Sequence, residues 1–269
     1  MGAVPEHDSA FTDQQYADIY PEGIQYHFWY VARNAIVSNA IRWIERLNQA
    51  SVGRMLEVGC GRGIVVEHLR GTGCDCYGAE LAPVAIPGAL KDYVWSGTDC
   101  LMLPSDFRNK VELILLLDVI EHIEDPVGFL ATIRRAYPNC QWLIVSVPAR
   151  MELWSSFDER YGHFRRYDGP MLRDEIERAG ADLIYWRYRF TLLYPLIYTL
   201  LRTGKGRALS NRAPRFRFLH RIIGEVLLRE TWLCSRRVYG TSIVGIARFR
   251  DHAPRVVGES TDRPVPHIG

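Results

Sequence analysis

A glycine-rich turn between an apolar strand and an amphipathic helix constrains the fold of this chain more than any other feature. The segment MLEVGCGRGIVVEHL begins at Met55, and it carries an acid and three glycines at Glu57, Gly59, Gly61 and Gly63. Glycine adopts positive φ and leaves no Cβ where the backbone must approach a ligand, while the start of the following helix offers unpaired N–H groups. We therefore expect this turn to hold a nucleoside-like ligand at the end of a strand.

Apolar runs of strand length alternate with helix-length amphipathic stretches after this turn, which is typical of a parallel sheet with crossover helices. The runs MLEV, CDCYGA, YVW, LILLL and WLIVSV predict five strands within 55–147, and Leu183–Arg189 and Ser242–Arg250 predict two more. The segment GPMLRDEIERAG predicts a helix that Pro170 opens and Gly180 closes. The predicted fold class is α/β, with a doubly wound, mostly parallel sheet of seven strands.

The chain is long enough for one large core. The chain has 269 residues, of which 48% are hydrophobic, so we expect a single domain over 51–250. We expect a helical cap over 1–50 before it, with helices at Asp8–Tyr20 and His27–Leu47. The segment 190–240 lies between the last two predicted strands and is apolar and basic in turn, so we expect a helical insertion there. Pro and polar residues dominate 251–269, which we expect to be a disordered tail.

Charge and cysteine usage narrow the class of protein. The 33 basic and 31 acidic side chains nearly cancel, so the chain lacks the strong field of a dedicated nucleic-acid-binding protein. The six cysteines are scattered and no secretory signal is recognisable, which favours free thiols in the cytoplasm. The longest apolar run, Phe190–Leu201, is shorter than the roughly 20 residues of a membrane span. We expect a cytoplasmic protein with no transmembrane segment and no nucleic-acid partner.

The glycine spacing distinguishes between two kinds of nucleoside ligand. A dinucleotide-binding turn has the spacing G-x-G-x-x-G, whereas this turn has G-x-G-x-G, with Ile64 where the third glycine would fall. An acid two residues before the first glycine also disfavours a pyrophosphate. The turn resembles the first motif of the class I, Rossmann-like methyltransferases, E/D-x-G-x-G-x-G, which implies S-adenosyl-L-methionine (SAM) as the cofactor.

Other segments resemble the same family, over roughly 16–249. Glu80 ends the second predicted strand, where its carboxylate would accept from both ribose hydroxyls, and WSGTDCLMLP resembles the adenine-contacting segment. By themselves these acids could equally be solvated acids of a helix start and a turn. The predicted cofactor-binding residues are Glu57, Gly59, Cys60, Gly61, Gly63, Glu80, Leu81, Asp99, Cys100 and Asp118. The resemblance also implies the strand order 3-2-1-4-5-7-6 with an antiparallel seventh strand.

The segment LILLLDVIEHIEDP resembles the E/D-x-x-E-H-x-x-D motif of methyltransferases that act on ubiquinone precursors and on other small molecules. If the turn after the fourth strand is helical, Asp118, Glu121 and His122 project from one face, and His163 of GHFRRY can close over them. Glu121, His122 and His163 are therefore the candidate catalytic residues.

Three interpretations of this cluster stay open. His122 could accept the proton of an acceptor hydroxyl, because an unperturbed pKa of about 6.5 suits proton transfer near neutral pH. The cluster could instead hold a divalent metal, as E-x-x-E-H does in the small-RNA 2′-O-methyltransferases that the segment also resembles. Asp118 could also face the cofactor while Glu121 and His122 only pack. We assign no metal ligand from the sequence.

The resemblance implies a SAM-dependent methyltransferase acting on a small-molecule or a lipid- or glycan-linked acceptor, most readily at oxygen. Because methyl transfer is an in-line displacement, positioning supplies much of the acceleration. The alternatives are a nicotinamide-dinucleotide-dependent reductase, which the glycine spacing disfavours, and a cofactor-binding regulator without turnover. The sequence identifies neither the acceptor nor the oligomeric state.

The predicted insertion has an unusual composition. From Arg202 to Arg221 it contains seven basic residues and no acid, beside the apolar stretch FTLLYPLIYTLL. A basic and apolar surface element attracts anionic headgroups, so we expect peripheral membrane contact through 190–221. A buried helical pair with a solvated basic face is the alternative.

Overall fold

The computed structural model describes residues 20–203, 213–234 and 238–250. In these ranges a seven-stranded sheet has the order β3-β2-β1-β4-β5-β7-β6, and β7 runs antiparallel to both of its neighbours. Both features are as the sequence predicts. The strands are β1 (Arg54–Val58), β2 (Cys76–Glu80), β3 (Val94–Ser96), β4 (Val111–Leu117), β5 (Trp142–Pro148), β6 (Ala181–Arg189) and β7 (Ser242–Phe249). The predicted helix over Asp8–Tyr20, except its last residue, and the predicted tail 251–269 lie outside the described residues.

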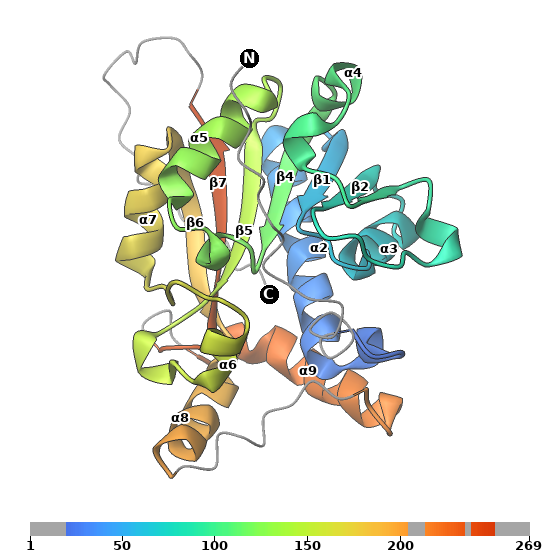
Figure 1. Ribbon diagram of the computed structural model, residues 1–269. Coiled ribbons are helices and arrows are strands. Elements are labelled where there is room, and N and C mark those ends of the chain that lie inside the picture. The colour runs from blue at the N-terminus through green and yellow to red at the C-terminus, as the bar shows by residue number, and fades with distance from the viewer. Residues whose placement is uncertain (1–19, 204–212, 235–237, 251–269) are drawn as a thin grey trace.

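Helices lie on both faces of the sheet (Figure 1). Asp125 and Asp168 each cap a helix by accepting a backbone N–H, and a proline follows in the first turn of both helices. The α-helices are α2 (Phe28–Asn48), α3 (Ile64–Gly71), α4 (Ser105–Arg108), α5 (Pro126–Ala136), α6 (Ser156–Arg160), α7 (Gly169–Arg178), α8 (Tyr194–Arg202) and α9 (Arg217–Leu233).

The central strands are apolar throughout because both of their faces are buried. In β4, Ile114 and Leu116 belong to a cluster with residues of α5 and α7, whereas Leu113 and Leu115 belong to a cluster with residues of α2 and α3. Successive side chains of a strand point to opposite faces, so each strand contributes to both layers. The sheet is thereby held rigidly between two helical layers.

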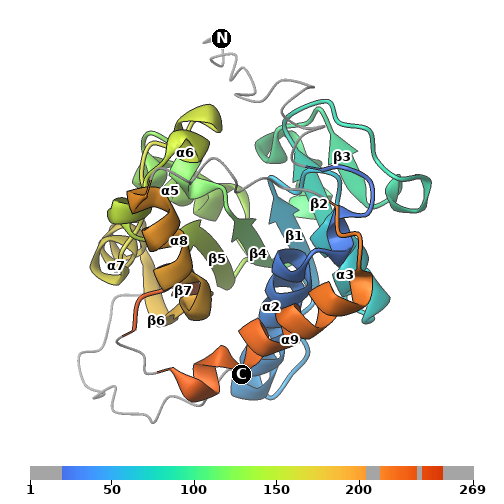
Figure 2. The ribbon, with the colours of Figure 1, turned by 90° about the horizontal axis from the view of Figure 1, so that it is seen from below.

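The predicted helical insertion contains α8 and α9. Because β5 and β6 are both antiparallel to β7, β6 ends and β7 begins at the edge where the parallel strands end. The two helices therefore emerge at that edge, and Figures 1 and 2 place both at the same end of the molecule. Within the part of the chain that the structure describes, no helix is long and apolar enough to cross a bilayer.

α9 packs closely along the first half of α2. A Cβ atom built on Gly224 would lie 2.8 Å from Cγ1 of Val31 and 3.2 Å from the carbonyl oxygen of Phe28. The backbone N–H of Phe28 also donates to Nδ1 of His220 at 3.2 Å. A glycine is thus required where the two helices touch.

We predict that Gly224→Val destabilises the protein by about 1 to 3 kcal/mol, because the added side chain overpacks the contact with α2. Thermal unfolding measures the loss. Gly71→Ala is the matched control: no heavy atom lies within 4 Å of its Cβ position, so stability should change by less than about 1 kcal/mol. Equal melting temperatures for Gly224→Val and the unaltered protein would contradict the prediction.

Candidate active site

The glycine turn after β1 adopts the conformation that its sequence predicts. Gly59, Gly61 and Gly63 have φ angles of 73°, 55° and 81°, which L side chains rarely adopt. Glu80 at the end of β2 holds the turn, since its Oε2 accepts from the N–H of Gly61 at 2.8 Å and its Oε1 accepts from the N–H of Ala82 at 3.0 Å. Glu80 thus orients the turn directly, and its ribose role stays a prediction.

Tyr20 lies over this turn and was not expected there from the sequence. A Cβ atom on Gly61 would collide with the Tyr20 hydroxyl oxygen. Nη1 of Arg62, within the turn, donates to the carbonyl oxygen of Tyr20 at 3.1 Å. The segment before α2 therefore covers the turn.

A buried acid and a buried guanidinium flank the turn. Glu57 is 3% exposed, and burial is the main cause that raises its pKa to about 8, while the nearby Arg33 opposes the rise. Nη1 of Arg33, from α2, lies 2.9 Å from Oδ2 of Asp118. Oε2 of Glu57 and Nε of Arg33 are buried without a hydrogen-bond partner among the described residues.

The two unpartnered atoms allow a comparison of Glu57 and Arg33 with the groups at the amino-acid end of SAM. An ammonium group would satisfy the acceptor on Glu57, and a carboxylate would satisfy the donor on Arg33. Buried polar atoms in folded proteins are nearly always partnered. The residues therefore fit the methionine moiety. Arg33 was not predicted as a site residue, because nothing in a helical sequence pattern indicates that a charged residue is buried.

The remaining predicted cofactor residues have defined places. Asp99 ends the segment after β3 and accepts from the N–H of Leu101 at 2.9 Å through Oδ1, so it acts as the cap of a short 3-10 turn. Cys60 and Cys100 are buried, whereas Leu81 is exposed. The contacts of Asp99 and Cys100 with adenine stay a prediction.

Asp118, Glu121 and His122 do not share one face of an α-helix, which corrects that prediction. Asp118 has a φ of 58°, and the next element is the single 3-10 turn η4 (Ile120–His122) rather than an α-helix. Oδ1 of Asp118 accepts from Oγ of Ser146 at 3.1 Å, and Oδ2 faces Arg33. Asp118 therefore connects β4, β5 and α2.

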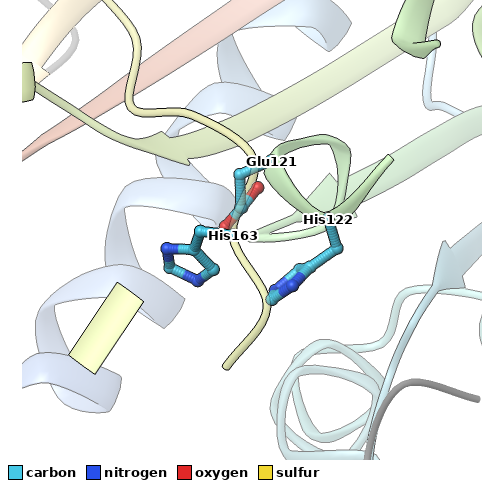
Figure 3. Close-up of side chains that lie close together, drawn as sticks. All are labelled: Glu121, His122 and His163. Atoms are coloured by element: carbon cyan, nitrogen blue, oxygen red, sulfur yellow. The ribbon is translucent and has the colours of Figure 1, made fainter. Parts of the chain in front are cut away.

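Glu121, His122 and His163 do come together, as expected. One ligand-type atom from each side chain lies within 4.8 Å of the other two, and Figure 3 shows the three side chains converging. The rings of His122 and His163 are 4.6 Å apart between centroids. The N–H of Phe164 donates to the carbonyl oxygen of Glu121 at 2.8 Å, which fixes the loop after α6 against η4.

Burial keeps the first two members of this cluster uncharged. Glu121 is 0% exposed, and burial followed by repulsion from Asp118 raises its pKa well above the usual value. Neither of its carboxyl oxygens has a hydrogen-bond partner among the described residues. Burial and the nearby His163 lower the pKa of His122 to about 4. Near neutral pH His122 is neutral and able to accept a proton.

Asp158 orients His163, and the sequence did not single it out. Its Oδ1 lies 2.8 Å from Nδ1 of His163 and 2.8 Å from Nε of Arg166. Burial raises the pKa of Asp158, but the bonds from His163 and Arg166 outweigh burial and lower it to about 2. An ionised carboxylate can only accept, so Nδ1 of His163 carries a proton and donates to Asp158.

The fold and the site together define a class I methyltransferase. A family model described as a methyltransferase domain matches residues 31–185, which is more than half of the chain. The chain belongs to this methyltransferase family.

A relative in Cereibacter sphaeroides, named ubiquinone biosynthesis O-methyltransferase, is 27% identical over 165 residues, covering 48% of this chain and 60% of the relative. This chain therefore spans less than two thirds of the length of that relative. The similar mitochondrial protein of Schizosaccharomyces pombe, also named ubiquinone biosynthesis O-methyltransferase, is 24% identical over 35% of this chain and 38% of its own.

The solved structures support the same fold. A chain of the complex between the Haloferax volcanii Trm112 methyltransferase activator and a methyltransferase has a TM-score of 0.54 at 14% identity, covering 90% of this chain and 97% of its own. The family match favours a methyltransferase over the nicotinamide-dependent reductase and over the regulator considered from the sequence.

We predict that Arg33→Gln weakens SAM binding about tenfold to a hundredfold, because a charged hydrogen bond to the cofactor carboxylate is lost. Isothermal calorimetry measures the affinity. Arg178→Gln, which removes an exposed arginine paired with Asp174 on α7, is the control and should bind normally. A folded Arg33→Gln protein with unchanged affinity would show that Arg33 does not contact the cofactor.

We predict that Asp158→Asn lowers turnover about tenfold to a hundredfold while SAM affinity is unchanged, since His163 loses the carboxylate that fixes its tautomer. The nitrogen shifts of the His163 ring, measured by NMR, should move at the same time. Asp168→Asn is the matched control because Asp168 also caps a helix, α7, but does not contact the cluster. A normal His163 spectrum in Asp158→Asn would refute the positioning role.

Proposed function

We propose that this protein transfers the methyl group of SAM to a hydroxyl oxygen of a small-molecule or lipid-linked acceptor. One observation carries the proposal: Asp118, which pairs with Arg33, and two members of the cluster, Glu121 and His122, all follow β4. The residues that fit the amino-acid end of SAM and the cluster are therefore joined by one short segment after this strand. The names of the curated relatives support oxygen as the acceptor atom.

SAM, when bound, supplies an electrophilic methyl group on sulfur. The residues of this chain then act on either side of it. Glu57 and Arg33 hold the amino-acid end, while Glu80 shapes the turn that supports the nucleoside. His122 is neutral because burial lowers its pKa to about 4, which also makes it a weaker base than a free imidazole. It accepts the proton of an acceptor hydroxyl as the oxygen becomes the nucleophile. His163, fixed by Asp158, orients that hydroxyl.

The cluster is also a candidate site for a divalent cation. The three candidate donors lie within 4.8 Å of one another, so a small movement of the side chains would bring them to the separation of about 4.2 Å or less that donors about 2.1 Å from one ion require. Glu121 offers two buried oxygens that have no partner among the described residues. If bound, such a cation would be held by Glu121, His122 and His163 and would lower the pKa of a coordinated hydroxyl.

We predict that His122→Ala lowers turnover about 10²- to 10⁴-fold and leaves SAM affinity unchanged, because only proton transfer or metal binding is lost. The assay follows labelled methyl from SAM into fractionated cell extract, with lipid fractions included. His68→Ala is the control, since His68 contacts Ser38 away from the cluster.

A chelator distinguishes metal binding by the cluster from proton acceptance by His122 alone. Loss of turnover on chelation, restored by added cation, would indicate a metal, whereas unchanged turnover would leave His122 acting as the base alone. Full turnover of His122→Ala with a genuine acceptor would refute both roles.

A further inference from the structure

The helix α9 is fixed to the protein on one side and is apolar on the other. Its inward side includes Gly224 against α2 and the buried Leu227. Glu230, also buried, accepts from the N–H of Leu192 at 3.1 Å and so ties α9 to the segment after β6. Because α9 is anchored in this way, its outward face has a defined orientation.

The outward face of α9 exposes large apolar side chains. Phe218 is 77% exposed, and Ile222 and Val226 are exposed at the same face because they follow at i+4 and i+8. Phe216, just before the helix, is 70% exposed, and Leu219 is exposed beside Phe218. We call these five residues the apolar stripe. An isolated exposed residue needs no explanation, but a contiguous stripe indicates a binding surface.

Basic side chains lie beside the apolar stripe. Arg221, Glu225 and Arg229 form a parallel row along α9, in which Glu225 pairs with Arg229. Arg215 and Arg217 are exposed next to Phe216 and Phe218. Among the described residues, no carboxylate pairs with Arg215, Arg217 or Arg221. An arginine side chain can extend its apolar stem along a hydrophobic region while its charge stays in water.

α8 lies at the same end of the molecule as α9 (Figure 2). It also exposes apolar side chains. None of its residues is buried, although its sequence YPLIYTLLR is mostly apolar, and Leu196 is 56% exposed. The hydroxyl of Tyr194 donates to Oε1 of Glu152 at 2.7 Å, so α8 is joined to the loop after β5. Within the described part of the insertion, α8 is therefore the helix with no buried residue, whereas α9 is buried on one side.

We propose that the apolar stripe of α9 and its flanking arginines bind an anionic phospholipid surface. The charge pattern selects this occupant: four exposed arginines lie on α9 and just before it, whereas the acids of α9 are Glu225, which is half-buried and paired with Arg229, and the buried Glu230. Anionic headgroups attract such arginines, and the boundary between headgroups and acyl chains receives Phe218 and Ile222. α9 then lies in the plane of the membrane, with α2 and the sheet above it.

Vesicle flotation with the full chain tests this surface, without SAM or acceptor, so that failure here is distinct from failure of the proposed methyl transfer. We expect binding to vesicles of one part phosphatidylglycerol to three parts phosphatidylcholine, and weak binding to phosphatidylcholine alone. Phe218→Ser with Ile222→Ser should weaken binding by about tenfold or more, and Arg221→Gln by about fivefold. Added salt should weaken binding in the same direction as Arg221→Gln.

Two controls match these variants. Ile184→Ser removes an exposed apolar residue from β6, and Lys110→Gln removes one positive charge at the opposite edge of the sheet. Both should bind vesicles normally, and circular dichroism should show that every variant is folded. Equal vesicle binding by Phe218→Ser with Ile222→Ser and the unaltered chain would overturn the proposal. So would self-association through this face without vesicle binding.

Discussion

The ion pair between Arg33 and Asp118 is the contact on which the arrangement of the site depends. It joins a helix that precedes the sheet to the end of the central strand β4. The side chains of Arg33 and Asp118 are 12% and 30% exposed, so the charges interact through a medium less polar than bulk water. Removing one member would leave the other uncompensated, which typically costs more than the intact pair contributes.

The same pair separates two regions of the site with different electrostatics. On one side, Glu57 and Arg33 offer one acceptor and one donor to a zwitterionic group. On the other side, Glu121 and His122 are kept uncharged by burial, while Asp158 stays ionised because His163 and Arg166 donate to it. Burial thus raises the pKa of the acid on each side, Glu57 and Glu121, whereas the charges that stay in place are those of the paired Arg33, Asp118, Asp158 and Arg166.

Much of the fold follows from the sequence because strands buried on both faces must be apolar throughout. LILLL and WLIVSV, for example, lie within β4 and β5. The glycine turn was also predictable, since positive φ at Gly59, Gly61 and Gly63 requires that residue type. The strand order came from the family resemblance, because periodicity carries no information on which strands are neighbours.

The rest of the site depends on contacts between segments far apart in the sequence. Arg33 and Tyr20 reach the turn only through the packing of α2 and the segment before it. Asp158 is part of a helix cap, and its contact with His163 arises from the loop that follows. The predicted helical face of Asp118, Glu121 and His122 was wrong because Asp118 itself has a positive φ, which turns the chain away from α-helical spacing.

The antiparallel β7 has a consequence for how the connection between β6 and β7 can change. Because β6 ends and β7 begins at the edge that carries the site, any segment between them must start and finish there. Such a segment can lengthen, shorten or change its chemistry while the β5–β7–β6 register and the glycine turn stay as they are. Changes in this connection are therefore separable from the cofactor turn, and the connection between β6 and β7 is a natural place to graft a segment from another protein of this fold.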